Sequence, residues 1–335
     1  MKRFAVIAVL LGALGVAATV VLSSLPAEEF ILAPDRATPL EDKVRVEGAR
    51  PAGDKSVYYV DVFVRRTSLL ERLLPFTRPE GSTVVPEDVL LPPGTTEEDR
   101  DRQTAAEMQR SEKIAALVAL RELGYDVHAQ PLGALVAGVV SDAPAAGVLE
   151  AGDVVVAVDG TKVRTPHELR AEIAKRRPGE DARLTVRRGG RELDVTVGTI
   201  PTPGEPERPF IGIQVDQAAD IDLPIDVDID LGRVGGPSAG LPFALEISRL
   251  LGRDVTPDSC RVAATGELAF DGSVISVGGV PQKTIGARRA DVDVFLVPAG
   301  RNAQDAREHA DDVRVVPVEN FRQALRYLTT SDLKC

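Results

Sequence analysis

Ser238 lies in a setting that could expose a nucleophile. It belongs to Gly235-Gly236-Pro237-Ser238-Ala239-Gly240, and the apolar stretch that follows predicts a helix that ends at Gly252. A serine at a helix N-terminus faces free backbone amides and the positive end of the helix dipole. Such amides can stabilise the oxyanion of a tetrahedral intermediate. The simpler alternative is that Ser238 only caps the helix.

A serine hydroxyl is a weak nucleophile and needs a base. Lys283 follows the glycine turn Gly278-Gly279 and lies just before a predicted helix over residues 284–290. Lysine can accept a proton when burial lowers its pKa, because desolvation disfavours the ammonium. Apolar neighbours of Lys283 favour such burial: Val280, Pro281 and Ile285.

The three histidines, His128, His167 and His309, are poorly placed to serve as the base instead. His128 and His167 belong to a different predicted domain, and His309 lies in a charged helix with a solvated face. The stretch over residues 278–284 is not a P-loop, because Gln282 stands where that motif requires glycine.

Further motifs follow in a fixed order around this pair. Residues 264–267 (ATGE) lie on a predicted strand, Asp271-Gly272 predicts a hairpin turn, and residues 295–308 (FLVPAGRNAQDARE) follow the lysine helix. Over residues 208–328 this order resembles the proteolytic domain of the Lon family, peptidases with a serine–lysine dyad. The resemblance implies that Ser238 is the nucleophile and Lys283 its partner.

The same resemblance implies roles for the neighbours of the dyad. Thr265 matches a threonine that hydrogen-bonds the lysine, and Gly236 and Ala239 are expected to support the nucleophile and its oxyanion. One departure concerns residues 233–235 (RVG), where many Lon proteases carry an acidic residue. Without a P-loop, the chain lacks the ATPase unit of complete Lon, so we expect flexible or unfolded polypeptide substrates and no cofactor or metal.

A second domain is indicated between Gly133 and Thr199. Its motifs are APAAG at residues 143–147, GDV at 152–154, VDG at 158–160 and RGG at 188–190. They resemble a PDZ domain of the bacterial protease-associated type. PDZ domains add a peptide as an extra strand and bind its carboxylate with backbone amides. We expect that carboxylate site at Leu132-Gly133-Ala134-Leu135, with the peptide pairing along residues 135–140; the alternative is a PDZ domain that only braces the protease.

The N-terminal segment predicts a membrane helix. Lys2 and Arg3 precede an uncharged run, Phe4 to Leu25, of 22 residues, and about 20 residues span a bilayer. The positive flank should stay inside, which places the rest of the chain outside. We expect an uncleaved signal anchor in the cell membrane; the alternative is a cleaved signal peptide, which also places the protein outside the cytoplasm.

Composition limits the partners and the cysteine chemistry. The net charge of −11 argues against a nucleic-acid partner, because phosphate binding requires clustered Lys and Arg. Only Cys260 and Cys335 occur. We expect Cys260 to be a small buried residue and Cys335 to lie on a tail; a Cys260–Cys335 disulfide is the alternative outside the cytoplasm.

The expected architecture is α+β: a Lon-like proteolytic domain with an inserted PDZ domain and an N-terminal transmembrane helix. The insertion is inferred because a strand over residues 56–65 and a helix over residues 95–123 resemble early Lon-like elements. The expected ranges are 1–26 for the anchor, 27–55 for a spacer, 56–124 for the first part of the Lon-like domain, 125–200 for the PDZ domain, 201–209 for a Pro-rich linker, 210–330 for the proteolytic domain and 331–335 for a tail.

The sequence thus predicts a membrane-anchored, ATP-independent serine endopeptidase whose PDZ domain recognises substrate tails. Two alternatives remain: a non-catalytic PDZ adaptor on a Lon-like scaffold, and a peptidase that processes only its own chain. Lon-like domains often form rings, so a hexameric homo-oligomer is a family-level expectation.

Overall fold

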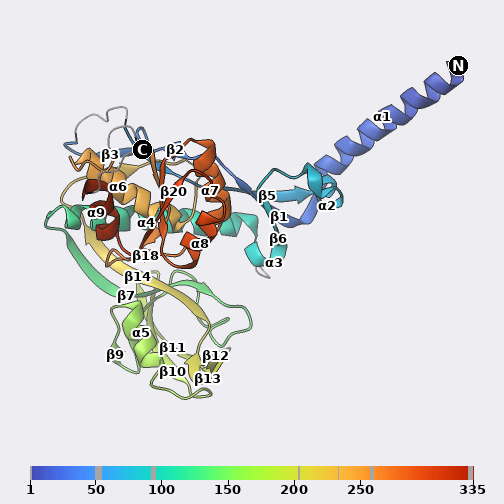
Figure 1. Ribbon diagram of the computed structural model, residues 1–335. Coiled ribbons are helices and arrows are strands. Elements are labelled where there is room, and N and C mark those ends of the chain that lie inside the picture. Colours follow the sequence, from blue (N-terminus) through green and yellow to red (C-terminus); the bar gives the residue numbers. More distant parts are fainter. Residues whose placement is uncertain are drawn as a thin grey trace. The chain divides into compact units, whose positions relative to one another are not determined.

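The computed structural model describes residues 2–49, 55–91, 96–202, 204–232, 234–256, 260–330 and 335 (Figure 1). They form two compact units. Unit 1 joins Met1–Leu123 to Ile225–Cys335, and unit 2 is Gly124–Pro224. Unit 1 is therefore built from two separate stretches of the chain.

A central sheet organises unit 1. Its order is β2 (Thr38–Pro39), β4 (Val57–Tyr59), β16 (Val262–Ala264), β19 (Val294–Pro298) and β20 (Arg314–Val318). The last four strands are parallel, and β2 pairs antiparallel with β4. Strand β19 is buried at all five positions, as expected when helices cover both faces of a parallel sheet.

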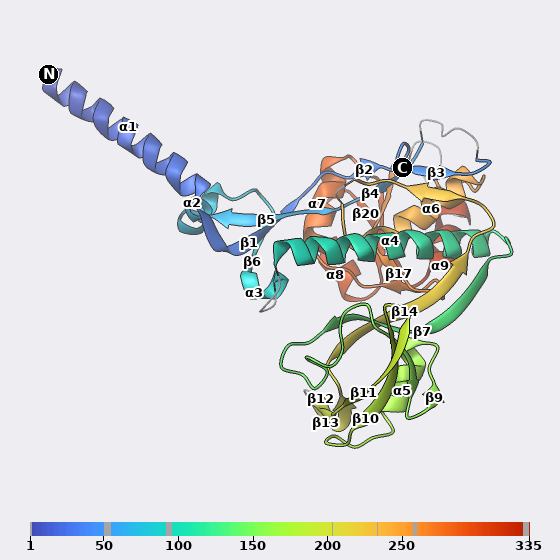
Figure 2. The same ribbon diagram turned by 180° about the vertical axis from the view of Figure 1, so that it is seen from behind.

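Helices cover the two faces of this sheet. Phe295 and Val297 of β19 pack in one cluster with residues of α7 (Val280–Arg289) and α8 (Arg301–Arg307). Helices α6 (Gly240–Leu250) and α9 (Phe321–Thr330) contact the sheet as well, and α4 (Glu97–Glu122) packs along α6 (Figure 2). The carboxyl ends of β4 and β16 thus meet at one edge of the sheet, close to the start of α6.

A buried acid fastens the two chain stretches of unit 1 to each other. Glu246 of α6 is fully buried and accepts hydrogen bonds from the Val57 amide at 3.0 Å and from Arg249 at 2.7 Å. A buried carboxylate is tolerated only when it is paired in this way. Strand β4 and helix α6 are therefore held in one register.

A second, antiparallel sheet of unit 1 has the order β5 (Val62–Ser68), β1 (Pro26–Pro34) and β6 (Thr83–Pro86). The strand predicted over residues 56–65 is therefore two strands, β4 and β5, interrupted at Val60 and Asp61. The short elements α2 (Leu69–Leu73), η1 (Pro75–Thr77) and α3 (Glu87–Leu90) complete this part.

The spacer predicted over residues 27–55 contains regular structure instead. It holds β1, β2 and β3 (Val44–Val46), and β3 pairs with β15 (Val227–Ile229). The physical reason is burial of apolar side chains: Phe30 is 2% exposed, and Ile31 and Leu40 are fully buried. Residues 50–54 of the predicted spacer lie outside the described part.

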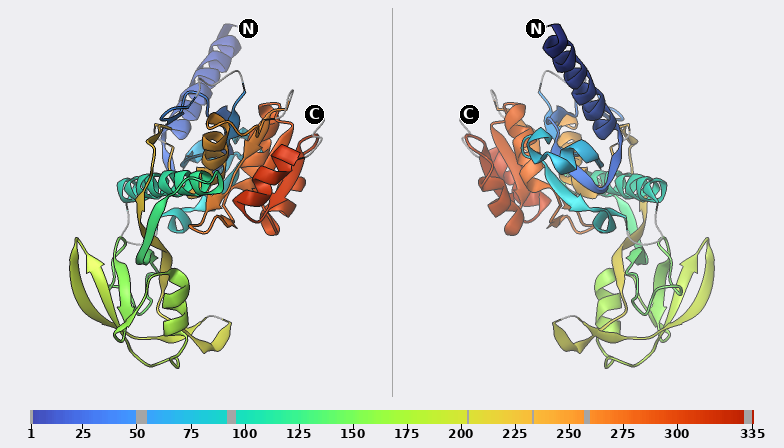
Figure 3. Two further views of the ribbon diagram at one scale, coloured as in Figure 1. Left: turned by 90° about the vertical axis from the view of Figure 1, so that its left-hand side faces the viewer. Right: turned by 90° about the vertical axis from the view of Figure 1, so that its right-hand side faces the viewer.

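The hairpin expected at Asp271-Gly272 is present. Strands β17 (Glu267–Leu268) and β18 (Val274–Ile275) pair on either side of the turn, and Gly272 adopts a positive φ of 86°. Figure 3 shows the ribbon in two further views, each turned by 90° about the vertical axis from the view of Figure 1.

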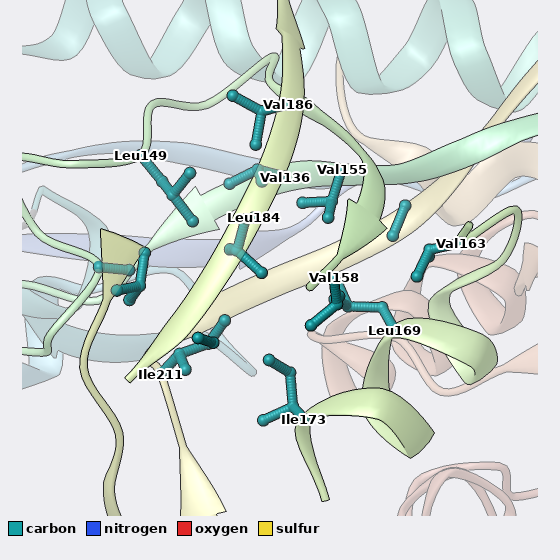
Figure 4. Packing of buried hydrophobic residues seen from close by; sticks show 14 residues of the cluster. Val136, Leu149, Val155, Val158, Val163, Leu169, Ile173, Leu184, Val186 and Ile211 are labelled. Carbon is teal, nitrogen blue, oxygen red and sulfur yellow. The ribbon is translucent and has the colours of Figure 1, made fainter. Parts of the chain in front are cut away.

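Unit 2 is an antiparallel sheet with one main helix. The sheet order is β11 (Arg191–Val197), β10 (Ala182–Arg188), β8 (Val154–Val158), β7 (His128–Val139) and β14 (Ile213–Asp222), with β9 (Thr161–Lys162) on β8. Val136, Val155 and Leu184 pack against Leu169 and Ile173 of α5 (Pro166–Ile173), as Figure 4 shows. Alternating apolar residues on these strands build this core.

Two stretches assigned elsewhere by the sequence belong to unit 2. The expected linker over residues 201–209 forms a hairpin of β12 (Ile200–Thr202) and β13 (Glu205–Phe210). Strand β14, which the range 210–330 placed in the proteolytic domain, pairs with β7 along ten residues from Ile213 to Asp222. Pro201 and Pro209 pair with each other in this hairpin, which their sequence pattern did not indicate.

The N-terminal segment is a helix, α1 (Lys2–Ser24). Across the described part of the chain, no helix combines the length and the apolar character that a bilayer crossing requires. The membrane span predicted over Phe4–Leu25 is therefore not found, and the side chains of its residues 4–9 lie outside the described part.

The two cysteines are joined, contrary to the favoured expectation. Cys260 and Cys335 form a disulfide that closes a separation of 75 residues, with 5.4 Å between their Cα atoms. Cys260 is also largely buried, so it fills the role expected of a small apolar residue at the same time. Of the predicted tail, residues 331–334 lie outside the described part.

Candidate active site

Ser238 lies in a short 3₁₀ turn, η2 (Pro237–Ala239), directly before α6. Gly236 precedes the turn with a φ of 90°, a conformation that glycine adopts without steric cost. The cap positions of η2 and α6 are Gly236 and Ala239, and neither helix has a side-chain cap hydrogen bond. The capping alternative for Ser238 is therefore wrong, and its hydroxyl is left for another use.

Lys283 reaches this hydroxyl from α7. Its Nζ donates a hydrogen bond of 2.7 Å to Ser238 Oγ. A second bond of 3.2 Å runs from Nζ to Thr265 Oγ1. The structure thus brings together the three side chains that the sequence proposed, from α7, η2 and the residue after β16.

Burial determines the protonation of Lys283. Only 3% of the residue is exposed. Desolvation lowers the pKa of its ammonium to about 8, and the nearby carboxylate of Asp61 opposes this decrease. A lysine with such a pKa is partly neutral near pH 8 and can then accept a proton.

Thr265 connects the backbone of the nucleophile with the lysine. Its hydroxyl donates to the Ser238 carbonyl oxygen at 3.2 Å and receives the Lys283 bond. The residue is fully buried. The backbone amide of Gly266 also donates to the Ser238 carbonyl oxygen, at 2.9 Å. The serine is therefore fixed from the β16 side.

Helix α4 holds the same loop from the opposite stretch of the chain. The Ser111 hydroxyl donates to the Pro237 carbonyl oxygen at 3.0 Å, and the Gly236 amide donates to the Thr104 carbonyl oxygen at 2.8 Å. Because the Gly236 amide is engaged, it does not serve as the oxyanion donor in this arrangement. Ala239 is buried directly after the serine, and its expected role at the oxyanion stays a prediction.

A cavity of about 530 Å³ opens over the dyad. Its walls come from the β4–β5 stretch, from α4 and from the residues around Ser238 and Lys283, and they carry no histidine among the described lining residues. Val234 and Gly235 line it as well, whereas Arg233, the start of the departure noted above, lies outside the described part.

Sequence reasoning missed the residues that β4, β5 and α4 contribute to this cavity, including Asp61, Phe63 and Thr104. They precede Ser238 by more than 100 positions and form no motif with it. The only available signal was the resemblance of this stretch to early Lon-like elements, which indicates a strand and a helix but no individual side chain.

The peptide site expected at Leu132–Leu135 is contradicted by the strand pairing in unit 2. These residues lie inside β7, where Ala134 and Leu135 pair with β14 on one side and with β8 on the other. A strand with neighbours on both sides offers no edge to a peptide and no free amide loop. The free edge on this side of the sheet belongs to β14.

Comparison with known proteins agrees with both sets of motifs. Residues 211–330 match the family model of the Lon protease (S16) C-terminal proteolytic domain. Residues 119–199 match that of the PDZ domain. The chain carries a Lon-type proteolytic domain and a PDZ domain. The Lon-type match decides this assignment, because the matched residues 211–330 include both Ser238 and Lys283.

Curated relatives of the Lon-type domain are named Lon proteases. That of Mesomycoplasma hyopneumoniae is 27% identical over 165 residues, which cover 42% of this chain and 19% of the relative. Lon protease 1 of Bdellovibrio bacteriovorus is 41% identical over 93 residues, which cover 27% of this chain and 11% of the relative. This chain therefore spans only a small part of those proteins.

Solved PDZ structures are similar to the other domain. The PDZ domain of an SdrC-like protein from Listeria monocytogenes is 26% identical, with a TM-score of 0.24; the match covers 25% of this chain and 87% of that structure.

Proposed function

We propose that this protein is a serine endopeptidase in which Ser238 is the nucleophile and Lys283 the general base. The observation that carries the proposal is the 2.7 Å hydrogen bond between Lys283 Nζ and Ser238 Oγ, made by a lysine whose burial lowers its pKa to about 8. In a non-catalytic scaffold this pair would not stabilise the fold, because burying an ammonium costs free energy. This argues against the non-catalytic adaptor.

The reaction is acyl transfer. Neutral Lys283 takes the proton of Ser238 Oγ while Oγ attacks the carbonyl carbon of the scissile peptide bond. The oxyanion lies near the amides at the start of α6, including that of Ala239. The Lys283 ammonium then gives its proton to the leaving amine, and Thr265 Oγ1 holds Nζ in place meanwhile. Water, deprotonated by Lys283, releases the acyl group and regenerates Ser238.

The substrates we propose are extended polypeptide segments. Strand β5 is an edge strand of its sheet, and its residues Val62, Phe63 and Val64 line the cavity over the dyad. An edge strand can pair with an extended peptide through main-chain hydrogen bonds. Phe63, 54% exposed, offers an apolar contact. Unfolded or flexible chains meet this requirement and folded ones do not.

For the PDZ domain we propose capture of substrate tails along β14. This strand is the free edge of its sheet, and helix α5 contacts it. The turn before it contains Gly212 with a φ of 83°, where an added Cβ would collide with Ala143. The proposed peptide site is therefore the edge of β14 and not the β7 residues Leu132–Leu135 that the sequence predicted.

Hydrogen exchange on the full chain tests this site. Adding a library of peptides with free C-termini should slow amide exchange in β14 and leave β11, the opposite edge of the same sheet, unchanged. The same library with amidated C-termini is the control and should protect β14 less. Protection of β11 instead, or equal protection by both libraries, would contradict carboxylate-dependent binding at β14.

We also propose an extracytoplasmic location, with attachment to the membrane through the N-terminal segment. The location is supported by the disulfide between Cys260 and Cys335, since disulfides persist in oxidising compartments. Attachment rests on the sequence of residues 2–25 alone.

Protease treatment of intact spheroplasts from a bacterium that expresses the full chain checks the location. We expect the chain to be digested from outside and to migrate differently on reducing and non-reducing gels. The Cys335→Ser variant should lose that difference in migration. A chain that is protected in spheroplasts and carries two free thiols would show a cytoplasmic location.

A further inference from the structure

Asp61 is an acidic residue in the catalytic cavity that no motif indicated. It lies at the break between β4 and β5 and lines the same cavity as Ser238 and Lys283. Tyr59, two positions earlier, pairs with Ala264 of β16 in parallel register. The chain after β4 and the chain after β16, which begins with Thr265, therefore leave the sheet at the same edge.

Close packing places the Asp61 backbone beside α7. An added Cβ at Gly279, the N-cap of α7, would lie 2.7 Å from Val62 Cγ2. An added Cβ at Gly286 would lie 2.9 Å from Val60 Cγ1 and would also collide with the Asp35 carbonyl oxygen. Val60 and Val62 thus touch α7 on either side of Lys283. Asp61 lies between these two contacts.

The charges around Lys283 come from several elements. Asp35 precedes β2, Tyr59 belongs to β4, and Arg100 and Asp101 belong to α4; all of them line the cavity. Of the charged groups that line the cavity, Asp61 is the one whose charge acts on Lys283 and tends to raise its pKa. Burial and the neighbouring Asp35 raise the pKa of Asp61, and Lys283 lowers it.

We propose that Asp61 is a positioning residue of the dyad: its carboxylate stabilises the Lys283 ammonium that forms when Ser238 loses its proton. The proton passes from Ser238 Oγ to Lys283 Nζ, and Asp61 stays ionised throughout. Lys283 Nζ has three donors as an ammonium, of which two go to Ser238 and Thr265. Lys283 and Asp61 line the same cavity, so we expect the third to face it. This role rests on the serine peptidase function proposed above.

The test is the pH profile of acylation by a fluorophosphonate, measured on the full chain. The wild-type rate should rise through a midpoint near pH 8, the pKa of Lys283. In Asp61→Asn the midpoint should move to lower pH by about one unit, the effect of losing a neighbouring opposite charge. The rate at high pH should fall as well, because the ammonium in the transition state loses its counter-charge.

Two variants separate this role from a structural one. Asp61→Glu keeps the charge and should keep the midpoint near that of the wild type. Asp88→Asn removes an exposed acid in α3 of the same unit and should change neither midpoint nor rate. A purely structural Asp61 would lower the rate of Asp61→Asn without moving its midpoint, and that result overturns the inference while leaving the dyad intact. Acylation of the wild type that does not depend on Ser238 would overturn both proposals.

Discussion

Replacing Ser238 by Ala should abolish cleavage of an unfolded protein substrate by the full chain. The loss should be about 10⁴-fold or more, the effect that removing the nucleophile has in other serine peptidases. Fold and stability should change little, because the Ser238 hydroxyl contacts Lys283 and caps no helix. Release of fluorescence from a labelled, unfolded protein measures the rate, and circular dichroism measures the fold.

Ser276→Ala is the matched control. This serine is exposed and lies between β18 and α7, so its loss should leave the cleavage rate within about twofold of the wild type. Cleavage that survives in Ser238→Ala would rule out the proposed nucleophile. Cleavage of the protein's own chain with none of the added substrate would favour the self-processing alternative.

Local motifs predicted the dyad because the residues that carry its chemistry lie in two short segments. Glycines before Ser238 and Lys283 specify a turn, and the segments that follow specify a helix start at each position. Their contact at 2.7 Å depends on the parallel pairing of β16 with β4 and β19, which places β16, directly before Thr265, in the middle of the sheet. The resemblance to the Lon family implied that Ser238 and Lys283 act together; the spacing of the motifs alone did not.

Other features could not be predicted because they depend on distant pairing. Strand β14 follows the prolines of residues 201–209, and the sequence assigned it to the proteolytic domain; its partner β7 lies about 80 residues earlier. The PDZ resemblance implied a peptide site on residues of β7, and no local pattern indicates that β14 pairs with this strand. Similarly, Asp61 looked like an ordinary charge within a single strand, since nothing local indicates a break there.

The free energy of unfolding should also depend on pH because Lys283 is buried. Its pKa is about 8 in the folded state and about 10.4 in an unfolded chain. Because the folded-state value is the lower one, the buried ammonium destabilises the fold at low pH. The unfolded chain binds more protons between these two values, so the free energy of unfolding rises with pH across that interval.

Lys283→Met removes this cost together with the base. Below pH 8 the variant should be more stable than the wild type by roughly 2 to 3 kcal/mol, since each pKa unit corresponds to about 1.4 kcal/mol and the methionine leaves two hydroxyls with one partner fewer. The difference should shrink as the pH rises from about 8 to about 10.4. Urea unfolding of the full chain at pH 6.5 and pH 10 measures it.

Lys283→Arg is the companion variant, because it removes the base but keeps a positive charge at this position. Guanidinium does not deprotonate in this range, so both variants should lose cleavage to the same extent as Ser238→Ala. Only the methionine variant, however, should gain stability, because arginine keeps a buried charge. If the methionine variant is less stable than the wild type at pH 6.5, the buried lysine stabilises the fold, and the proposed cost of its burial is contradicted. An enzyme that holds its base in a destabilising site gives up stability for a proton acceptor that works near neutral pH.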